Sequence, residues 1–166
     1  VADSLFTETC SHYKELASIV SQVKVRPSVI LERKYGSTWF VPSGNSYIGI
    51  LHKDAGADYV FRESEGSGSI PYSFETVLDK GEKADFWLFK YDSPAPFSYR
   101  DLEKEYNPYN CFEAFRQKRI FACNTVRTHY YDDITLHPDW ILEDLINIYH
   151  PELTEGYQPR YYFPLQ

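Results

Sequence analysis

Short apolar runs that alternate with amphipathic segments constrain the fold of this chain more than any other feature. The runs with strand character lie at residues 28–33, 58–61, 85–89 and 119–123. Helical periodicity or a helix start signal marks residues 3–23, 46–55, 73–82, 99–105, 109–117 and 138–149. Strands joined by helical crossovers pair in parallel, with helices on both faces of the sheet. The sequence therefore predicts an α/β fold, a three-layer sandwich with a mostly parallel central sheet.

The segments between the runs divide into loops and helix starts. Residues 35–45, 62–72, 91–98 and 124–137 are expected to be loops, because they are rich in Gly, Ser, Pro or Asp. Ser43 or Asn45 is expected to cap the helix over 46–55, and Ser73 the helix over 73–82. The Pro-rich segment after residue 150 is expected to be irregular. No strand precedes the helix over 3–23, and a domain that opens in this way is expected to be one lobe of a larger protein.

Charge and chain length exclude some classes of function. The 166 residues are enough for one domain with a core of its own, and 17 Lys and Arg against 24 Asp and Glu give a net charge of -7. The basic residues are scattered, which argues against a nucleic-acid binder, since that needs clustered Lys and Arg. No apolar run approaches the ~18 residues of a membrane helix. The chain contains no Met and no signal peptide, so it is expected to be a mature form or a fragment.

The three cysteines, Cys10, Cys111 and Cys123, do not define the redox compartment. No Cys-x-x-Cys pair is present, so a structural zinc site is not expected. An odd number leaves at least one free thiol. Buried small side chains are the simpler interpretation, and a Cys111–Cys123 disulfide stays open as an alternative.

Aromatic residues gather where the predicted strands end. Phe, Trp and Tyr make up 17% of the chain, and 15 of these residues are Tyr. In parallel sheets, ligands bind at the carboxyl ends of the strands, where the loops collect. These post-strand loops carry Tyr35, Trp39, Phe40, Tyr72, Tyr91, Phe97, Arg127, His129, Tyr130 and Tyr131. The sequence predicts an aromatic wall with a few polar groups at this edge.

A different class of function has one candidate site. The segment "HYYDDITLH" at 129–137 contains His129, Asp132, Asp133 and His137, which are common metal ligands. A metal-dependent α/β hydrolase that uses this loop is the alternative interpretation. No Gly-x-Ser-x-Gly elbow or phosphate loop is present, so no other motif in the sequence indicates catalysis. An aromatic-rich carbohydrate-binding module is a third interpretation, which the helical periodicity opposes.

Three segments together carry a family resemblance. They are "YGSTWFVPSGNSYIGILHKDAGADYVF" at 35–61, "GSIPYSFETVLDKGEKADFWL" at 68–88 and "HPDWILEDLINIYHPEL" at 137–153. In order and spacing they resemble the C-terminal lobe of ABC-transporter substrate-binding proteins for ferric siderophores, haem and cobalamin. In that family, a rigid helix joins two α/β lobes. The resemblance implies that residues 1–26 contain the end of the interlobe helix and that residues 27–166 form the C-terminal ligand-binding lobe.

The resemblance also implies a function without catalysis. The protein would capture an iron complex (a siderophore or haem) or cobalamin outside the cytoplasm and deliver it to an ABC importer, with no cofactor of its own. The ligand-binding residues carried over from the family are Tyr35, Trp39, Ser43, Asn45, Tyr91 and Arg127. Trp39 and Phe40 have a structural alternative, which is that their rings fill the core. The sequence does not identify the ligand.

The remaining implied features concern partners and location. Glu75, in "SFE" at 73–75, matches the acidic residue with which the family docks on arginines of the membrane permease. An acidic residue in a first helical turn also interacts favourably with the helix dipole, so Glu75 has a structural explanation too. The expected partners are a missing N-terminal lobe and the permease. The expected location is periplasmic or extracytoplasmic, with a lipid anchor outside this chain.

Overall fold

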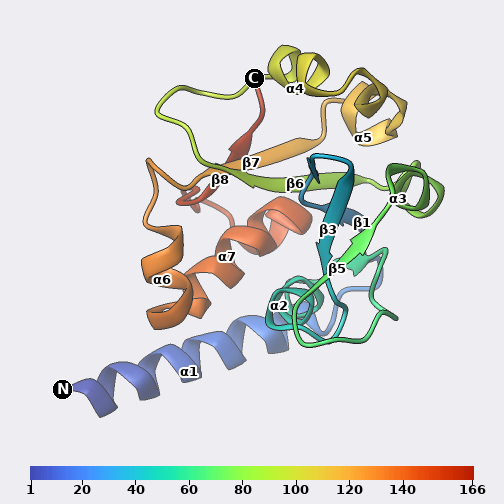
Figure 1. The fold of residues 1–166 in the computed structure, drawn as a ribbon. Coiled ribbons are helices and arrows are strands. Elements are labelled where there is room, and N and C mark those ends of the chain that lie inside the picture. The colour runs from blue at the N-terminus through green and yellow to red at the C-terminus, as the bar shows by residue number, and fades with distance from the viewer.

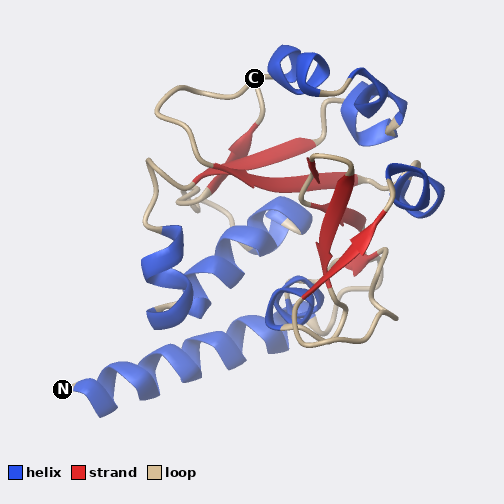
Figure 2. Cartoon of the chain, in the orientation of Figure 1, coloured by secondary structure: helices blue, strands red, loops and turns tan.

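The computed structural model describes all of residues 1–166, and a five-stranded sheet lies at its centre, in the order β4-β1-β6-β7-β8. The strands are β1 (Ser28–Leu31), β4 (Asp58–Tyr59), β6 (Phe86–Tyr91), β7 (Ile120–Asn124) and β8 (Tyr162–Pro164). All neighbours pair in parallel except β8, which is antiparallel to β7. Helices cover both faces, as Figures 1 and 2 show. The predicted α/β class with a mostly parallel sheet is confirmed.

The helices form two layers around this sheet. They are α1 (Ala2–Val20), α2 (Tyr47–Asp54), α3 (Phe74–Gly81), α4 (Tyr99–Glu105), α5 (Glu113–Arg116), α6 (Tyr130–Leu136) and α7 (Pro138–Tyr149). Helices α1 and α7 lie on one face, and α4 and α5 lie on the other (Figure 1). The predicted helix over 109–117 is instead a 3-10 turn, Asn107–Cys111, followed by the short α5. A second 3-10 turn, Pro151–Leu153, follows α7.

Serine side chains fix three of the helix starts. Ser46, Ser73 and Ser98 accept hydrogen bonds from the backbone N–H groups of Gly49, Thr76 and Asp101. These bonds satisfy donors that the first turn of a helix leaves free. The prediction for Ser73 is confirmed. The prediction that Ser43 or Asn45 caps α2 is wrong, because the cap is Ser46.

A second, three-stranded antiparallel sheet occupies segments that the sequence predicts to be loops. It consists of β2 (Lys34–Tyr35), β3 (Thr38–Pro42) and β5 (Ser69–Tyr72), in the order β2-β3-β5. The loop prediction fails because it gives weight to Gly and Ser and overlooks the alternation within β3. Trp39 and Val41 are buried, whereas Phe40 between them is exposed, which is the period of a half-buried strand.

The C-terminal segment is ordered by a single buried carboxylate. Asp144, on α7, accepts hydrogen bonds from the backbone N–H groups of Arg160 (2.7 Å), Tyr161 (3.3 Å) and Tyr162 (2.8 Å). The hydroxyl of Tyr157 donates a further bond of 2.9 Å to the same side chain. These contacts bring β8 to the sheet, although the sequence predicts an irregular tail. Local composition did not indicate the strand because the bonds that order it come from α7.

An aromatic cluster joins the two sheets. The ring centroids of Trp39 (β3) and Trp87 (β6) are 5.6 Å apart, and Tyr109 and Phe112 pack against both indoles. The Trp39 indole N–H donates a 2.9 Å hydrogen bond to the carbonyl of Leu31, so its polar atom is satisfied in the core. The cluster fixes the position of the second sheet against the first.

The cysteines form no disulfide. Cys10, Cys111 and Cys123 are all free thiols, of which Cys111 is exposed and Cys123 buried. Burial raises the pKa of the Cys123 thiol to about 11, so it stays protonated at neutral pH. The Cys111–Cys123 disulfide that the sequence left open is therefore not formed. None of the helices combines the length and the apolar character needed to cross a membrane.

Neighbouring residues on β3 provide a test of the core. Trp39→Ala removes a fully buried ring that holds the second sheet, and we expect it to lower the free energy of unfolding by about 3–5 kcal/mol. Phe40→Ala is the matched control, because this ring is 44% exposed, and it should cost less than about 1.5 kcal/mol. Urea unfolding measures both. Similar losses for the two variants would contradict this account of the core.

A buried histidine predicts how stability depends on pH. His52 (α2) is 2% exposed, with Nδ1 2.7 Å from the Tyr149 hydroxyl, and burial lowers its pKa from 6.5 to about 3. The unfolded chain therefore takes up this proton at a higher pH than the folded protein does. Stability linked to His52 is present above pH 6.5 and is lost as the pH falls below 6.5 towards 3.

His52→Gln should remove this contribution to the loss of unfolding free energy at acid pH. Between pH 6 and 4, we expect the free energy of unfolding of the wild type to fall more steeply than that of the variant, by up to about 1.4 kcal/mol per pH unit. Urea unfolding at several pH values measures the slopes. The control is His129→Gln, because the His129 side chain is 85% exposed, and it should retain the wild-type slope. Parallel curves for wild type and His52→Gln would rule out the linkage.

Candidate functional site

The carboxyl ends of β1, β6 and β7 lie side by side at one edge of the central sheet, because these strands are parallel and adjacent. Loops that leave this edge carry exposed aromatic side chains. In sheets of this type, the edge is where ligands bind, since it gathers loops from several strands.

The last two residues of β6 divide this edge into two hollows. Successive side chains on a strand point to opposite faces of its sheet. Lys90 accordingly lines one hollow and Tyr91 lines the other. We call the first the hairpin hollow, because the β2–β3 hairpin borders it, and the second the β8 hollow.

The hairpin hollow is lined by exposed aromatic rings and by polar side chains. It encloses about 490 Å³, and its aromatic members Tyr35, Tyr47 and Phe40 are 83%, 55% and 44% exposed. The hydroxyl side chains of Ser46, Ser67 and Ser69 also line it. A large ring in water is unfavourable by comparison with a buried one, so three of them around one hollow indicate a surface that a ligand or partner covers.

An ion pair between Glu32 and Lys90 lies in the hairpin hollow, with side chains that are 25% and 17% exposed. The Lys90 ammonium also lies over the ring of Tyr130, 5.5 Å from its centroid. Burial alone would lower the pKa of Lys90, but the adjacent Glu32 carboxylate outweighs it, and the pKa is raised. Lys90 therefore remains charged at neutral pH.

The backbone at Glu32 is held in a conformation that L-residues rarely adopt. Its φ of 65° lies in the left-handed region, which costs a non-glycine residue roughly 1–3 kcal/mol. Two hydrogen bonds hold it there. The Glu32 N–H donates to the carbonyl of Leu88 (2.9 Å), and the Trp87 indole donates to the Glu32 carbonyl (2.7 Å). This conformation directs the Glu32 side chain towards Lys90 at the strand end.

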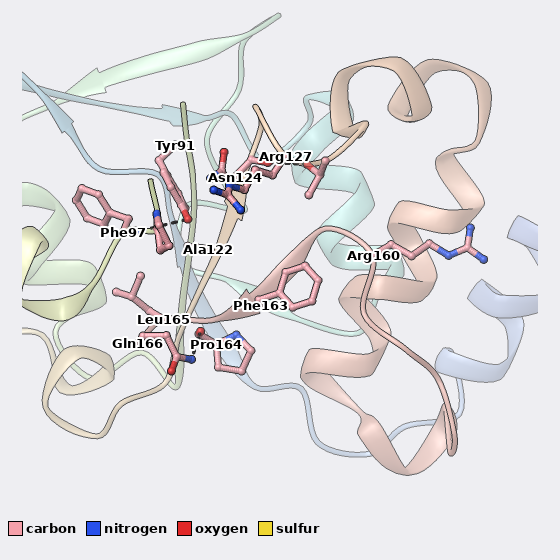
Figure 3. A pocket seen from close by; sticks show the side chains of 12 residues that line it. Tyr91, Phe97, Ala122, Asn124, Arg127, Arg160, Phe163, Pro164, Leu165 and Gln166 are labelled. Atoms are coloured by element: carbon pink, nitrogen blue, oxygen red, sulfur yellow. Dashed lines mark hydrogen bonds between the residues drawn. The ribbon is translucent and has the colours of Figure 1, made fainter. Parts of the chain in front are cut away.

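The β8 hollow, shown in Figure 3, encloses about 410 Å³ on the opposite face of the sheet. Tyr91, Phe97 and Phe163 supply its rings, and Arg127 supplies a cation at its edge. The Arg127 side chain is held by its Nε and Nη2 atoms, which donate to the carbonyl of Pro94 at 3.1 and 2.7 Å. Arg160 also lines the hollow, but its guanidinium points away from it in Figure 3 and lies 4.5 Å from the ring centroid of Trp140.

The structure brings three of the predicted ligand-binding residues to the carboxyl edge. Tyr35 lies in the hairpin hollow, and Tyr91 and Arg127 lie in the β8 hollow. The predicted single wall is thus divided between two faces of the sheet. The sequence could not show this, because the division depends on which way β6 side chains point at its last two residues.

For two residues, the prediction that they contact the ligand is wrong. Trp39 and Ser43 are both 0% exposed and cannot contact a ligand in this conformation. Trp39 belongs to the core cluster because β3 folds onto the sheet. The Ser43 hydroxyl donates a 2.7 Å bond to the carbonyl of Gly66 and so ties two loops together.

Asn45 is exposed, but the structure does not bring it to either hollow. Its side-chain carbonyl accepts a 3.1 Å bond from the N–H of Gly66. It lines a separate surface depression beside Arg26 and Lys53. Asn45 therefore lies apart from Tyr35, and its role in binding stays a prediction.

Sequence reasoning missed Glu32, Lys90 and Tyr47 as members of the edge. A signal for the first two was present, since each is a charged residue that ends an apolar run, "VILE" and "FWLFK". Tyr47 lies in the first turn of α2, and its hydroxyl donates to the carbonyl of Ile134 at 3.0 Å. That contact joins α2 to α6 and could not be read from local sequence.

The residues of the alternative metal site do not converge. His129 Nδ1 lies 3.5 Å from Asp132 Oδ2 on the surface, whereas Asp133 accepts a 2.8 Å bond from the hydroxyl of Tyr161. The His137 ring stacks on Trp140 with a centroid distance of 3.6 Å. No three His, Cys, Asp or Glu side chains lie close enough to hold a metal ion together. The four residues of the hydrolase interpretation therefore do not form one metal site.

Glu75 lies in the first turn of α3, where it is exposed and forms no ion pair. It is outside both hollows. The helix dipole explains why an acidic residue is tolerated there. Its predicted docking role stays a prediction.

The family of the chain follows from comparison with known proteins. The family model described as "Periplasmic binding protein" matches residues 2–125, which include α1 and all four parallel strands. The chain belongs to the periplasmic binding protein family. A relative among curated proteins, an uncharacterized lipoprotein of Methanocaldococcus jannaschii, is 30% identical over 149 residues. That match covers 87% of this chain and 34% of the relative.

Several solved structures share the fold of this chain at low sequence identity. The TroA-like periplasmic binding protein FepB from Veillonella parvula has a TM-score of 0.74 and 16% identity, with 99% of this chain and 56% of that chain covered. IsdE of S. aureus, solved with heme, has a TM-score of 0.65 and 18% identity, with 89% of this chain and 57% of that chain covered. Helicobacter pylori CeuE with Ni(II) bound has a TM-score of 0.70 and 14% identity, with 95% of this chain and 48% of that chain covered.

The chain therefore spans about a third of its curated relative and about half of each of these structures. Its fold is a Rossmann-like lobe of the periplasmic binding type, and the family consists of substrate-binding proteins that need no cofactor.

The C-terminal wall of the β8 hollow depends on the Asp144 carboxylate. Asp144→Ala leaves three backbone N–H groups without their acceptor, and we expect the amides of residues 160–162 to exchange with solvent at least about tenfold faster. Hydrogen exchange measured by NMR tests this. Glu143→Ala, at the adjacent position, is the control and should leave these amides protected. Unchanged protection in Asp144→Ala would show that other contacts hold β8.

Proposed function

We propose that this chain is the ligand-binding lobe of an extracytoplasmic solute-binding protein that captures an iron complex or cobalamin and delivers it to an ABC importer. The observation that carries the proposal is the set of exposed rings at the carboxyl edge, Tyr35, Phe40 and Tyr47. The fold buries most of its other large aromatic side chains. Rings left in water around a hollow at this edge suit a planar or apolar ligand.

The comparisons support the class of ligand. A related structure was solved with heme, another with Ni(II), and a third is a siderophore periplasmic binding protein from Thermobifida fusca. Each of these statements concerns the related protein. For this chain, the family membership and the aromatic edge together support a metal complex as ligand, with the siderophore, haem or cobalamin left as alternatives.

The division of the chain follows from the same proposal. Residues 1–26 would be the end of the interlobe helix, and residues 27–166 the C-terminal lobe. A second lobe of the same protein would then supply the other half of the cleft. The partial coverage of the related chains, 45–57% in five solved structures, supports this arrangement.

The partners and location are proposed on the same basis. Glu75 would dock on arginine residues of the permease, since it is exposed in the first turn of a helix and has no partner within the lobe. The protein would be held outside the cytoplasm, and the lipoprotein relative supports a lipid anchor. The protein would act by binding and release, without catalysis.

A titration tests the function. We expect ferric siderophores, haemin or cyanocobalamin to bind this chain at least about a hundredfold more weakly than a two-lobe protein that contains it, because half of the contact surface is absent. Isothermal titration calorimetry of the two-lobe protein and NMR titration of this chain measure both affinities. Failure of every probe to bind the two-lobe protein would refute the proposal.

Tyr35→Ala tests the contribution of the edge. We expect it to weaken binding of the active probe by about tenfold, because a stacked ring contributes on the order of 1 kcal/mol or more. Phe6→Ala is the matched control, since this ring is 71% exposed on α1 but lies outside the hairpin hollow. Equal effects of the two substitutions would show that the ligand does not contact Tyr35.

A further inference from the structure

The Glu32–Lys90 pair lines the hairpin hollow and leaves hydrogen-bonding capacity unused. The Lys90 ammonium has three N–H donors, of which one bonds Glu32 Oε1. Glu32 has a second carboxylate oxygen, Oε2, which accepts no hydrogen bond from the protein and is not sealed from solvent. Both side chains line the hollow. A donor and an acceptor therefore lie next to each other in its lining.

The pair is held in place from both sides. The left-handed backbone at Glu32 is fixed by the Leu88 carbonyl and the Trp87 indole. Lys90 belongs to the central strand β6, and its ammonium lies over the ring of Tyr130. The backbone that carries each side chain is therefore fixed in the central sheet, and the two charged groups hold each other through their ion pair, so donor and acceptor lie together before a ligand arrives.

The charges of the pair restrict what can bind beside it. A ligand carboxylate would meet a lysine whose charge is already balanced, and it would be repelled by Glu32. A ligand ammonium would be attracted by Glu32 but repelled by Lys90. Either ion would lose its hydration on entering the hollow without gaining an unopposed counter-charge. Specificity often depends on unfavourable contacts of this kind as much as on favourable ones.

A neutral group that both donates and accepts meets neither penalty. A primary amide can donate an N–H to Glu32 Oε2 and accept an N–H from Lys90 with its carbonyl oxygen, with no charge to desolvate. The rings of Tyr35, Phe40 and Tyr47 leave room for an apolar body attached to that amide.

We propose that the Glu32–Lys90 pair makes the hairpin hollow selective for uncharged, amide-bearing groups of the ligand over carboxylates and amines. This inference rests on the proposed function in taking the hairpin hollow as part of the ligand site. It goes further in naming the chemical group that is recognised and the two residues that recognise it.

Three small probes that share one ring test the selectivity on this chain. We would titrate the 166-residue protein with benzamide, benzoate and benzylamine and follow the backbone amide signals of Glu32, Tyr35 and Lys90 by NMR. We expect benzamide to bind at least about fivefold more tightly than either ion. Tightest binding by benzoate or benzylamine, or equal binding by all three, would overturn the proposal.

Charge-changing variants test the roles of the two residues. Glu32→Gln leaves Lys90 as an unbalanced cation, so benzoate should become the preferred probe. Lys90→Met leaves Glu32 as an unbalanced anion, so benzylamine should become the preferred probe. Glu155→Gln removes one negative charge at an exposed site outside the hollow and should keep the wild-type order. If both Glu32→Gln and Lys90→Met keep the wild-type order of affinities for the three probes, the proposal is overturned. The dispersion of their NMR spectra shows whether each variant is folded.

The fragment test and the importer-ligand titration test different proposals, so one can be refuted while the other stands. If benzamide is preferred but no siderophore, haemin or cyanocobalamin binds the two-lobe protein, the recognition chemistry stands and the proposed function falls. If an importer ligand binds and the three fragments do not differ, the function stands and the role of the ion pair is refuted.

Discussion

The packing of Trp39 on Trp87 is the interaction on which the rest of the structure depends. It connects the antiparallel β2-β3-β5 sheet to the central parallel sheet through two fully buried indoles. Because β3 is held by Trp39 on its inner side, its outer residue Phe40 is directed to solvent. The β2–β3 hairpin is thereby fixed, and with it the position of Tyr35. A core contact thus determines where the exposed rings of the carboxyl edge lie.

At the same edge, consecutive residues of one parallel strand line two different hollows. Lys90 and Tyr91 are consecutive residues, yet one lies in the hairpin hollow and the other in the β8 hollow. The pleat of β6 separates a charged, hydrogen-bonding surface from a more apolar one with Arg127 at its edge. A ligand that reaches over the strand ends would meet both, which suits a large ligand with chemically different parts.

Buried polar groups in this lobe have distinct roles. Asp144 is fully engaged by backbone donors and orders the C-terminal segment, and His52 is kept neutral by burial beside Tyr149. Glu32 and Lys90 differ, because each has capacity that the protein leaves unused. Satisfied polar groups specify the fold, whereas groups with unused capacity at a strand end are available to a ligand.

The sequence by itself determined the α/β class, the four parallel strands, most of the helices and the aromatic character of the carboxyl edge. These depend on local periodicity and on which residues follow an apolar run, and both are present in the chain as written. Only the tertiary structure decided that Trp39 is core and Tyr35 is surface, that β8 joins the sheet, and that Glu32 meets Lys90. Each of these depends on a contact between distant segments, such as Asp144 with the C-terminal strand or the hairpin with β6. Local sequence cannot rank an exposed ring against a buried one when the partner that buries it is many residues away.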